Sequence, residues 1–128
     1  MLKLTLSTLA LVLTATAASA LTVDCKLVSD PVEAERMSLV SRFVIDSAAQ
    51  RVDMMIGDEA EWTFRRGGPD LFDKEGDTFA VRRDASGFSG AGMRAGIPHA
   101  FTFAAASRAV TWTYVSKDKI TQMRWRCS

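Results

Sequence analysis

An alternation of apolar and polar residues with a period of two runs through most of the chain, and it constrains the fold more than any other feature. It is clearest at residues 21–27, where four apolar side chains alternate with Thr22, Asp24 and Lys26. Because successive side chains of a β-strand point to opposite faces, this period predicts strands. The pattern recurs at residues 37–45, 52–56, 62–64, 79–81, 101–103, 110–114 and 123–127.

Turn signals rich in Gly, Pro, Asp and Ser separate these segments, for example at residues 56–58, 66–70 and 84–87. Such spacing is typical of an all-β sandwich or barrel. We therefore predict a small antiparallel meander of eight or nine strands. One segment differs: Ser29-Asp30-Pro31, followed by acidic residues, has the composition of a helix start and predicts one short helix near residues 31–37.

The chain has two cysteines, Cys25 and Cys127, and each lies on the apolar phase of its segment. We predict that they form a disulfide on the core side, which on the chain-entropy model contributes up to about 4–5 kcal/mol. A disulfide requires Cα atoms within about 7 Å, so the first and last strands must be neighbours. This favours a closed or nearly closed barrel, and a two-sheet sandwich is the alternative.

The N-terminus has the three parts of a secretory signal peptide. One cation, Lys3, precedes an uncharged apolar stretch that ends in the small-residue pattern Ala18-Ser19-Ala20. The stretch is too short for a bilayer crossing, which needs about 20 residues. We expect cleavage between Ala20 and Leu21, leaving residues 21–128 as one domain without a membrane anchor. Such a protein would be secreted, or periplasmic if its source is Gram-negative.

Charge and ligand types disfavour several functions at the level of sequence. Once Lys3 has been removed, basic and acidic side chains balance, and a net charge near zero disfavours the binding of nucleic acid and other polyanions. His99 is the single histidine, and the acidic run Asp73, Glu75, Asp77 lacks the spacing of a calcium loop. We therefore expect no metal site, no cofactor, no catalytic residues and no nucleic-acid partner.

The glycine-rich stretch from Gly87 to Gly96 is the most unusual part of the chain. It contains imperfect versions of a nucleophile elbow and of a phosphate loop, each one residue short of the motif. We predict a candidate binding region consisting of Gly87, Ser89, Gly90, Gly92, Arg94, Gly96 and His99.

These features favour an exported, non-catalytic binding or accessory module of the cell envelope, inhibitor-like in kind, with an envelope protein as its partner. The alternative is a barrel that carries a small apolar ligand, and a hydrolytic enzyme is a third reading. The segments 43–54 and 101–112 also resemble each other without gaps. Shared hairpin chemistry and internal duplication both explain that resemblance.

Overall fold

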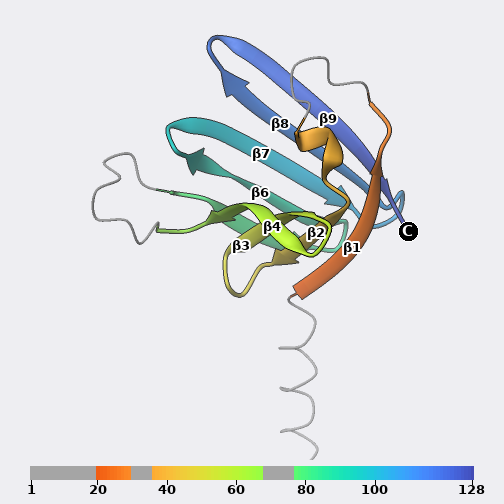
Figure 1. Ribbon diagram of the computed structural model, residues 1–128. Coiled ribbons are helices and arrows are strands. Elements are labelled where there is room, and N and C mark those ends of the chain that lie inside the picture. Colours follow the sequence, from red (N-terminus) through yellow and green to blue (C-terminus); the bar gives the residue numbers. More distant parts are fainter. Residues whose placement is uncertain (1–19, 30–35, 68–76) are drawn as a thin grey trace, which may run out of the picture.

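The computed structural model describes residues 20–29, 36–67 and 77–128, which form one antiparallel sheet of nine strands (Figure 1). The strand count confirms the all-β prediction of eight or nine strands. The strands are β1 (Ala20–Leu27), β2 (Arg42–Asp46), β3 (Arg51–Ile56), β4 (Glu59–Arg65), β5 (Ala80–Asp84), β6 (Gly87–Arg94), β7 (Ile97–Ala104), β8 (Ala109–Ser116) and β9 (Lys119–Cys127).

The order of strands in the sheet is β4-β3-β2-β1-β9-β8-β7-β6-β5. The first and last strands are therefore neighbours, as the cysteine positions predicted. We call β1 to β4 the first half of the sheet and β5 to β9 the second half. The two halves are joined where β1 pairs with β9, while β4 and β5 form the two edges.

The sheet is not closed, so the predicted closed barrel is not confirmed. Within the described residues, the edge strands β4 and β5 approach each other through an isolated bridge between Arg66 and Thr78. Beside it, the Phe79 amide donates to the Arg65 carbonyl over 3.3 Å. The sandwich alternative fits loosely, because the two halves face each other across a common core.

Two side chains, Gln50 and Arg94, form hydrogen bonds to the edge strands on either side of the opening. The Gln50 side-chain amide accepts from the Val81 backbone N–H at 2.9 Å and donates to the Val81 carbonyl at 2.7 Å. Gln50 thus takes the place of a strand residue beside β5. On the other edge, the Arg94 guanidinium donates to the Thr63 carbonyl at 3.0 Å. These contacts satisfy edge groups that would otherwise be open to further pairing.

Aromatic side chains from both halves fill the core. The Trp112 ring centroid lies 4.6 Å from that of Phe64 and 6.3 Å from that of Phe43, so β8 packs against β4 and β2. The Trp125 indole N–H donates to the Val40 carbonyl, and no described buried side-chain N or O atom lacks a hydrogen-bond partner. The residues below 2 % exposure include Trp112, Trp125, Phe43, Phe64, Phe79, Ile45, Met54 and Met123.

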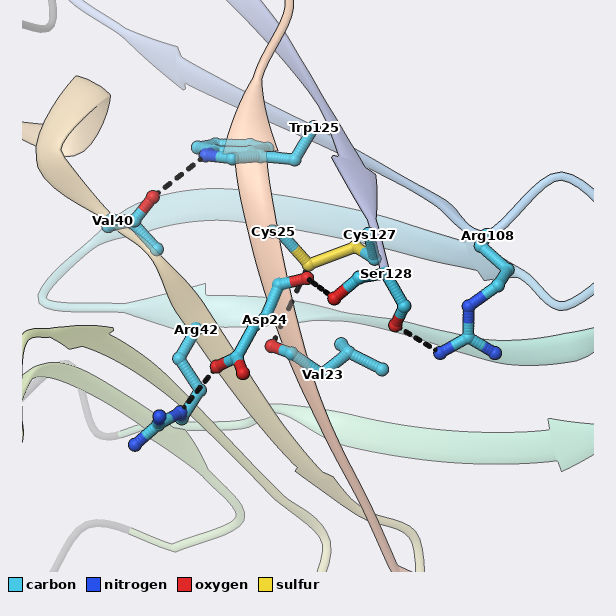
Figure 2. Close-up of a disulfide and its surroundings, with 9 residues drawn as sticks. All are labelled: Val23, Asp24, Cys25, Val40, Arg42, Arg108, Trp125, Cys127 and Ser128. Atoms are coloured by element: carbon cyan, nitrogen blue, oxygen red, sulfur yellow. Dashed lines mark hydrogen bonds and ion pairs between the residues drawn. A yellow bond between two sulfur atoms is a disulfide. The ribbon is translucent and has the colours of Figure 1, made fainter.

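The predicted disulfide between Cys25 and Cys127 is confirmed, and it lies at the seam between the two halves (Figure 2). The two cysteines are directly paired in the β1–β9 ladder, which has three residue pairs. Their amides donate elsewhere, Cys25 to the Ser41 carbonyl and Cys127 to the Arg108 carbonyl. The bond therefore adds a covalent link where the hydrogen-bonded ladder is short.

The two similar segments form hairpins of the same geometry. Phe43 pairs with Met54 across β2 and β3, and Phe101 pairs with Trp112 across β7 and β8. Gln50 and Arg108, at equivalent positions of the two turns, both have positive φ, 54° and 51°. The two segments that resemble each other in sequence thus share both their strand pairing and their turn conformation.

Other predictions fall at the boundaries of the described chain. Residues 1–19, with most of the predicted signal peptide, and residues 30–35, with most of the predicted helix, lie outside it. The described neighbour of the latter is a single 3-10 turn, η1 (Met37–Leu39), whose Met37 is buried. None of the helical residues that the structure describes belongs to a helix long and apolar enough to cross a membrane.

Candidate functional site

Two of the glycines in the predicted binding region are required by close backbone packing. Gly87 has φ +141°, and a Cβ atom there would lie 1.9 Å from the Phe103 carbonyl oxygen. Gly92 has φ +156°, and its Cβ would lie 2.5 Å from the Thr78 carbonyl oxygen. The backbone of β6 can therefore run against β7 and against the residues that lead into β5, because these positions have no side chain.

Gly90 and Gly96 also have structural roles. A Cβ on Gly90 would lie 2.3 Å from the Phe101 ring and 2.8 Å from the Phe79 ring, so the missing side chain makes room for these stacked aromatics. Gly96, with φ +77°, completes the turn between β6 and β7. The glycine-rich sequence of the predicted binding region thus lies in a strand pair with tight aromatic packing.

Arg94 and His99 lie together on the inner side of the sheet, around Phe64. The Arg94 guanidinium carbon is 5.5 Å from the Phe64 ring centroid, and the His99 ring centroid is 4.8 Å from it. His99 is half-buried, and its Nδ1 accepts a hydrogen bond from the Trp112 indole N–H at 3.0 Å. Because an indole nitrogen is a donor, this contact requires Nδ1 to be unprotonated.

Burial lowers the pKa of His99 to about 4, with a smaller contribution from the nearby positive charge of Arg94. The imidazole is therefore neutral at physiological pH. One ring nitrogen is already used by Trp112, which leaves His99 as part of the core packing. Together these contacts bring two of the predicted site residues together, in a structural cluster with Phe64.

Because the pKa of His99 is low in the folded protein, the protein should become less stable as the pH is lowered. The unfolded chain, with a histidine pKa near 6.5, takes up the proton first, so stability decreases as pH falls from about 6.5 to about 4. We expect a loss of about 1–2 kcal/mol by pH 5, after allowance for the partial exposure of the ring. Urea unfolding at pH 7 and pH 5 measures it.

The control for this prediction is His99→Gln, whose side-chain oxygen can still accept from Trp112 but does not titrate. The difference in unfolding free energy between pH 7 and pH 5 should shrink in this variant. An unchanged difference would assign the pH dependence to other groups.

The outer face of the second half carries a different cluster, which we call the outer row. It consists of one residue from each of five neighbouring strands, at directly paired positions: Arg82, Ser89, Thr102, Thr111 and Arg124. Three hydroxyl side chains therefore stand in line between two guanidinium groups. At a strand spacing of about 4.8 Å, the row spans about 19 Å.

Two shallow grooves open along the outer row. The larger, of about 390 Å³, is lined by Thr102, Thr111 and Arg124 of the row together with Ala104, Ala109 and Arg126 and others. The smaller, of about 300 Å³, is lined by Arg82, Ser89, Ala80, Gly90 and Ala91. Small side chains form the floor of each groove, so a ligand can approach the sheet closely. Of the predicted site residues, Ser89 and Gly90 border these grooves.

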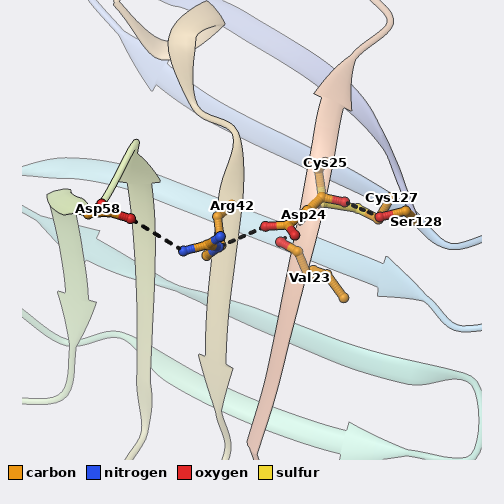
Figure 3. Close-up of polar contacts among 7 residues, drawn as sticks. All are labelled: Val23, Asp24, Cys25, Arg42, Asp58, Cys127 and Ser128. Atoms are coloured by element: carbon orange, nitrogen blue, oxygen red, sulfur yellow. Dashed lines mark hydrogen bonds and ion pairs between the residues drawn. A yellow bond between two sulfur atoms is a disulfide. The ribbon is translucent and has the colours of Figure 1, made fainter.

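Two arginines on the outer face of the first half, Arg42 and Arg51, are paired with carboxylates, as Figure 3 shows for Arg42. Arg42 lies between Asp24, at 2.7 Å, and Asp58, at 3.9 Å. Arg51 pairs in the same way with Asp53 at 3.0 Å. These guanidinium groups are therefore already neutralised by acidic neighbours on the same face.

The arginines of the outer row are not held in ion pairs of this kind in the described part of the chain, although Asp84 lies two residues from Arg82 on the same face of β5. Within the described part of the chain, Arg82, Arg124 and the adjacent Arg126 form no ion pair. Arg82 does help to lower the pKa of Asp84, but the main causes there are the hydrogen bonds from Ser86. Arg126 is in addition opposed by another cation, Lys26, across the β1–β9 ladder. The outer face of the second half is thus positively charged.

The sequence contains this asymmetry, although a whole-chain charge balance conceals it. Residues 80–128 contain two acidic residues, Asp84 and Asp118. The same stretch contains eight basic residues, Arg82, Arg83, Arg94, Arg108, Lys117, Lys119, Arg124 and Arg126. A charge count for each half, combined with the period of two, would have pointed to this face.

Neither a metal-ligand cluster nor a similarity to a known protein points to another functional site. No group of three or more His, Cys, Asp or Glu side chains that could hold a metal occurs among residues 20–29, 36–67 and 77–128; Asp73 and Glu75 lie outside these ranges. No protein-family model, no curated protein and no solved structure matches the chain. The geometry of the outer row therefore carries the functional argument alone.

Proposed function

We propose that the protein is an exported, non-catalytic binding module of the cell envelope, and that the outer row is its binding surface. The observation that carries the proposal is the line of three hydroxyls between two arginines that form no ion pair in the described chain, along which two grooves open. Unneutralised guanidinium groups beside hydroxyls offer hydrogen bonds to an anionic ligand.

The export part of the proposal rests on the N-terminal sequence and on the disulfide. Disulfides persist mainly in oxidising compartments such as the periplasm and the cell exterior. Cleavage between Ala20 and Leu21 would leave β1 nearly intact, because Ala20 contributes the outermost pair of the β1–β2 ladder, with Asp46. The mature chain would therefore keep the strand that holds Cys25.

The interior of the sheet favours binding on the outside over carriage of an apolar ligand inside. Phe43, Phe64, Phe79, Trp112 and Trp125 are each at most 1 % exposed and pack against one another. A closed barrel that holds a ligand would need this volume to be free. A hydrolase that used His99 as its base would need a free ring nitrogen, but Nδ1 accepts from the Trp112 indole and the neutral ring then carries its proton on Nε2.

A variant that blocks the outer face tests the proposal. Thr102 is exposed in the middle of the outer row, and Thr102→Trp places an indole over the larger groove. We expect a component of an envelope extract to be retained by the immobilised native protein and lost with this variant. The matched control is Thr22→Trp, an exposed threonine on the outer face of β1, in the first half.

Retention of the same component by Thr102→Trp at the native level would contradict the proposal. Circular dichroism and thermal unfolding of both tryptophan variants establish that a loss of binding does not come from misfolding. Both substitutions add the same side chain to an exposed strand position, so the two variants differ only in which half of the sheet is blocked.

A further inference from the structure

We infer that the ligand of the outer row is a linear anionic polysaccharide, whose sulfate or carboxylate groups bind the arginines and whose hydroxyls bind the row between them. This inference rests on the proposed function and names the class of its ligand. It starts from the order of side chains in the row: Arg82 and Arg124 at the ends, Ser89, Thr102 and Thr111 between them.

The hydroxyl groups favour a sugar over a peptide. A serine or threonine hydroxyl both donates and accepts, so each can pair with a sugar hydroxyl in either direction. An extended peptide instead has a backbone that needs amide and carbonyl partners, and a sheet offers these at its edges rather than on its face. The outer row lies on a face, where the backbone groups of β6, β7 and β8 are already used in ladders on both sides.

The row itself lacks the side chains on which binding to a lipid surface or to a tightly docked protein depends. Membrane-surface binding and protein hot spots both rely on exposed large apolar or aromatic side chains. Among described residues, the exposed large hydrophobics are Val28, Leu39, Val115 and Ile120. None belongs to the row; Val28 lines the larger groove, and Val115 pairs with Ile120 near the β8–β9 turn.

The positive charge of the outer face attracts an anionic ligand, and the two separated arginine positions of the row fix how a long ligand lies on it. Arg124 and Arg126 project from the same face of β9, and Arg82 lies about 19 Å away across the sheet. Two separated cationic ends suit a repeating polymer that carries several anionic groups better than a compact single anion. Guanidinium groups bind sulfate and carboxylate bidentately, which gives each end a defined position.

Calorimetric titration of the whole mature protein tests this inference with four probes at low ionic strength. The probes are a heparin oligosaccharide, an oligogalacturonate, neutral dextran and oligoglutamate. We expect binding of one or both anionic sugars, with affinity that falls as salt is added, and no binding of dextran. Binding of oligoglutamate at equal or higher affinity than either anionic sugar would overturn the assignment to polysaccharide.

Two substitutions separate the charge contribution from the hydroxyl contribution. Arg124→Ser should weaken binding of the anionic sugar about tenfold, since charge-assisted hydrogen bonds are among the stronger contacts. Its control is Arg66→Ser, an exposed arginine at the end of the first half, which should leave affinity within about twofold. Equal losses in the two variants would mean non-specific attraction and overturn the inference.

Thr102→Val keeps the side-chain shape and removes one hydroxyl of the row. It should weaken binding of the sugar about threefold and leave any binding of oligoglutamate unchanged. If no sugar binds while Thr102→Trp still abolishes retention of an envelope component, the ligand class is wrong and the binding surface stands. If neither sugar nor envelope component depends on this face, the proposed function fails as well.

Discussion

Replacing both cysteines, Cys25→Ser with Cys127→Ser, should lower the free energy of unfolding by about 2–5 kcal/mol. The disulfide closes a loop across a sequence separation of 102 residues, so its loss restores much conformational freedom to the unfolded chain. It also removes the covalent link from the three-pair ladder that joins the two halves of the sheet. Because small domains have roughly 5–15 kcal/mol of stability, this loss is a large share of the total.

Urea unfolding, followed by tryptophan fluorescence and by circular dichroism, measures this effect. Trp125, close in sequence to Cys127, reports the seam through its indole bond to the Val40 carbonyl (Figure 2). The matched control is the native protein treated with a reductant, which breaks the bond without changing the sequence. A change below about 1 kcal/mol in both samples would show that the seam is held by its non-covalent contacts.

The substitution Gly87→Ala should lower the free energy of unfolding by about 3 kcal/mol or more, an effect as large as that of truncating a large core side chain. The added Cβ would meet the Phe103 carbonyl oxygen at 1.9 Å, and the φ of +141° is strained for any L side chain. The obstacle is backbone in the β6–β7 ladder, so a side-chain rotation cannot relieve it. We expect the start of β6 to shift away from β7, with a lower midpoint of thermal unfolding.

Gly57→Ala is the control for this prediction. Gly57 also has a positive φ, +62°, but nothing lies within 4 Å of the position that its Cβ would take. Gly57→Ala should therefore lower the free energy of unfolding by about 1–2 kcal/mol, which is the strain of a left-handed backbone conformation alone. If the two alanine variants were equally stable, the close approach at Gly87 would not constrain the fold.

Much of the fold could be predicted because its causes are local. The period of two in residues 21–27 and 123–127 reflects strands with one buried face, and the structure has β1 and β9 there. The phase of Cys25 and Cys127 placed both on the core side, which a direct pair in one ladder requires. The number of strands follows from the alternation of neighbouring residues, and the disulfide follows from the apolar phase that the two cysteines share.

The candidate site could be predicted only in part, since the Gly87–Gly96 stretch suggested binding while close packing explains its glycines. Glycine composition by itself does not distinguish a mobile loop from a strand pressed against its neighbours, because both need a residue without a side chain. Of the seven predicted residues, Ser89 and Gly90 border the grooves of the outer face, whereas Arg94 and His99 point inward around Phe64.

The sequence by itself determined the all-β class, the strand periods and the covalent pairing of the chain ends, because each depends on side-chain alternation along one strand. Only the tertiary structure decided where the sheet stays open, since the contact of Gln50 with Val81 joins residues 31 positions apart. It also decided which side chains stand in one line across five strands, from Arg82 to Arg124. Such a line depends on the register of every intervening pair, and register is set by packing between strands.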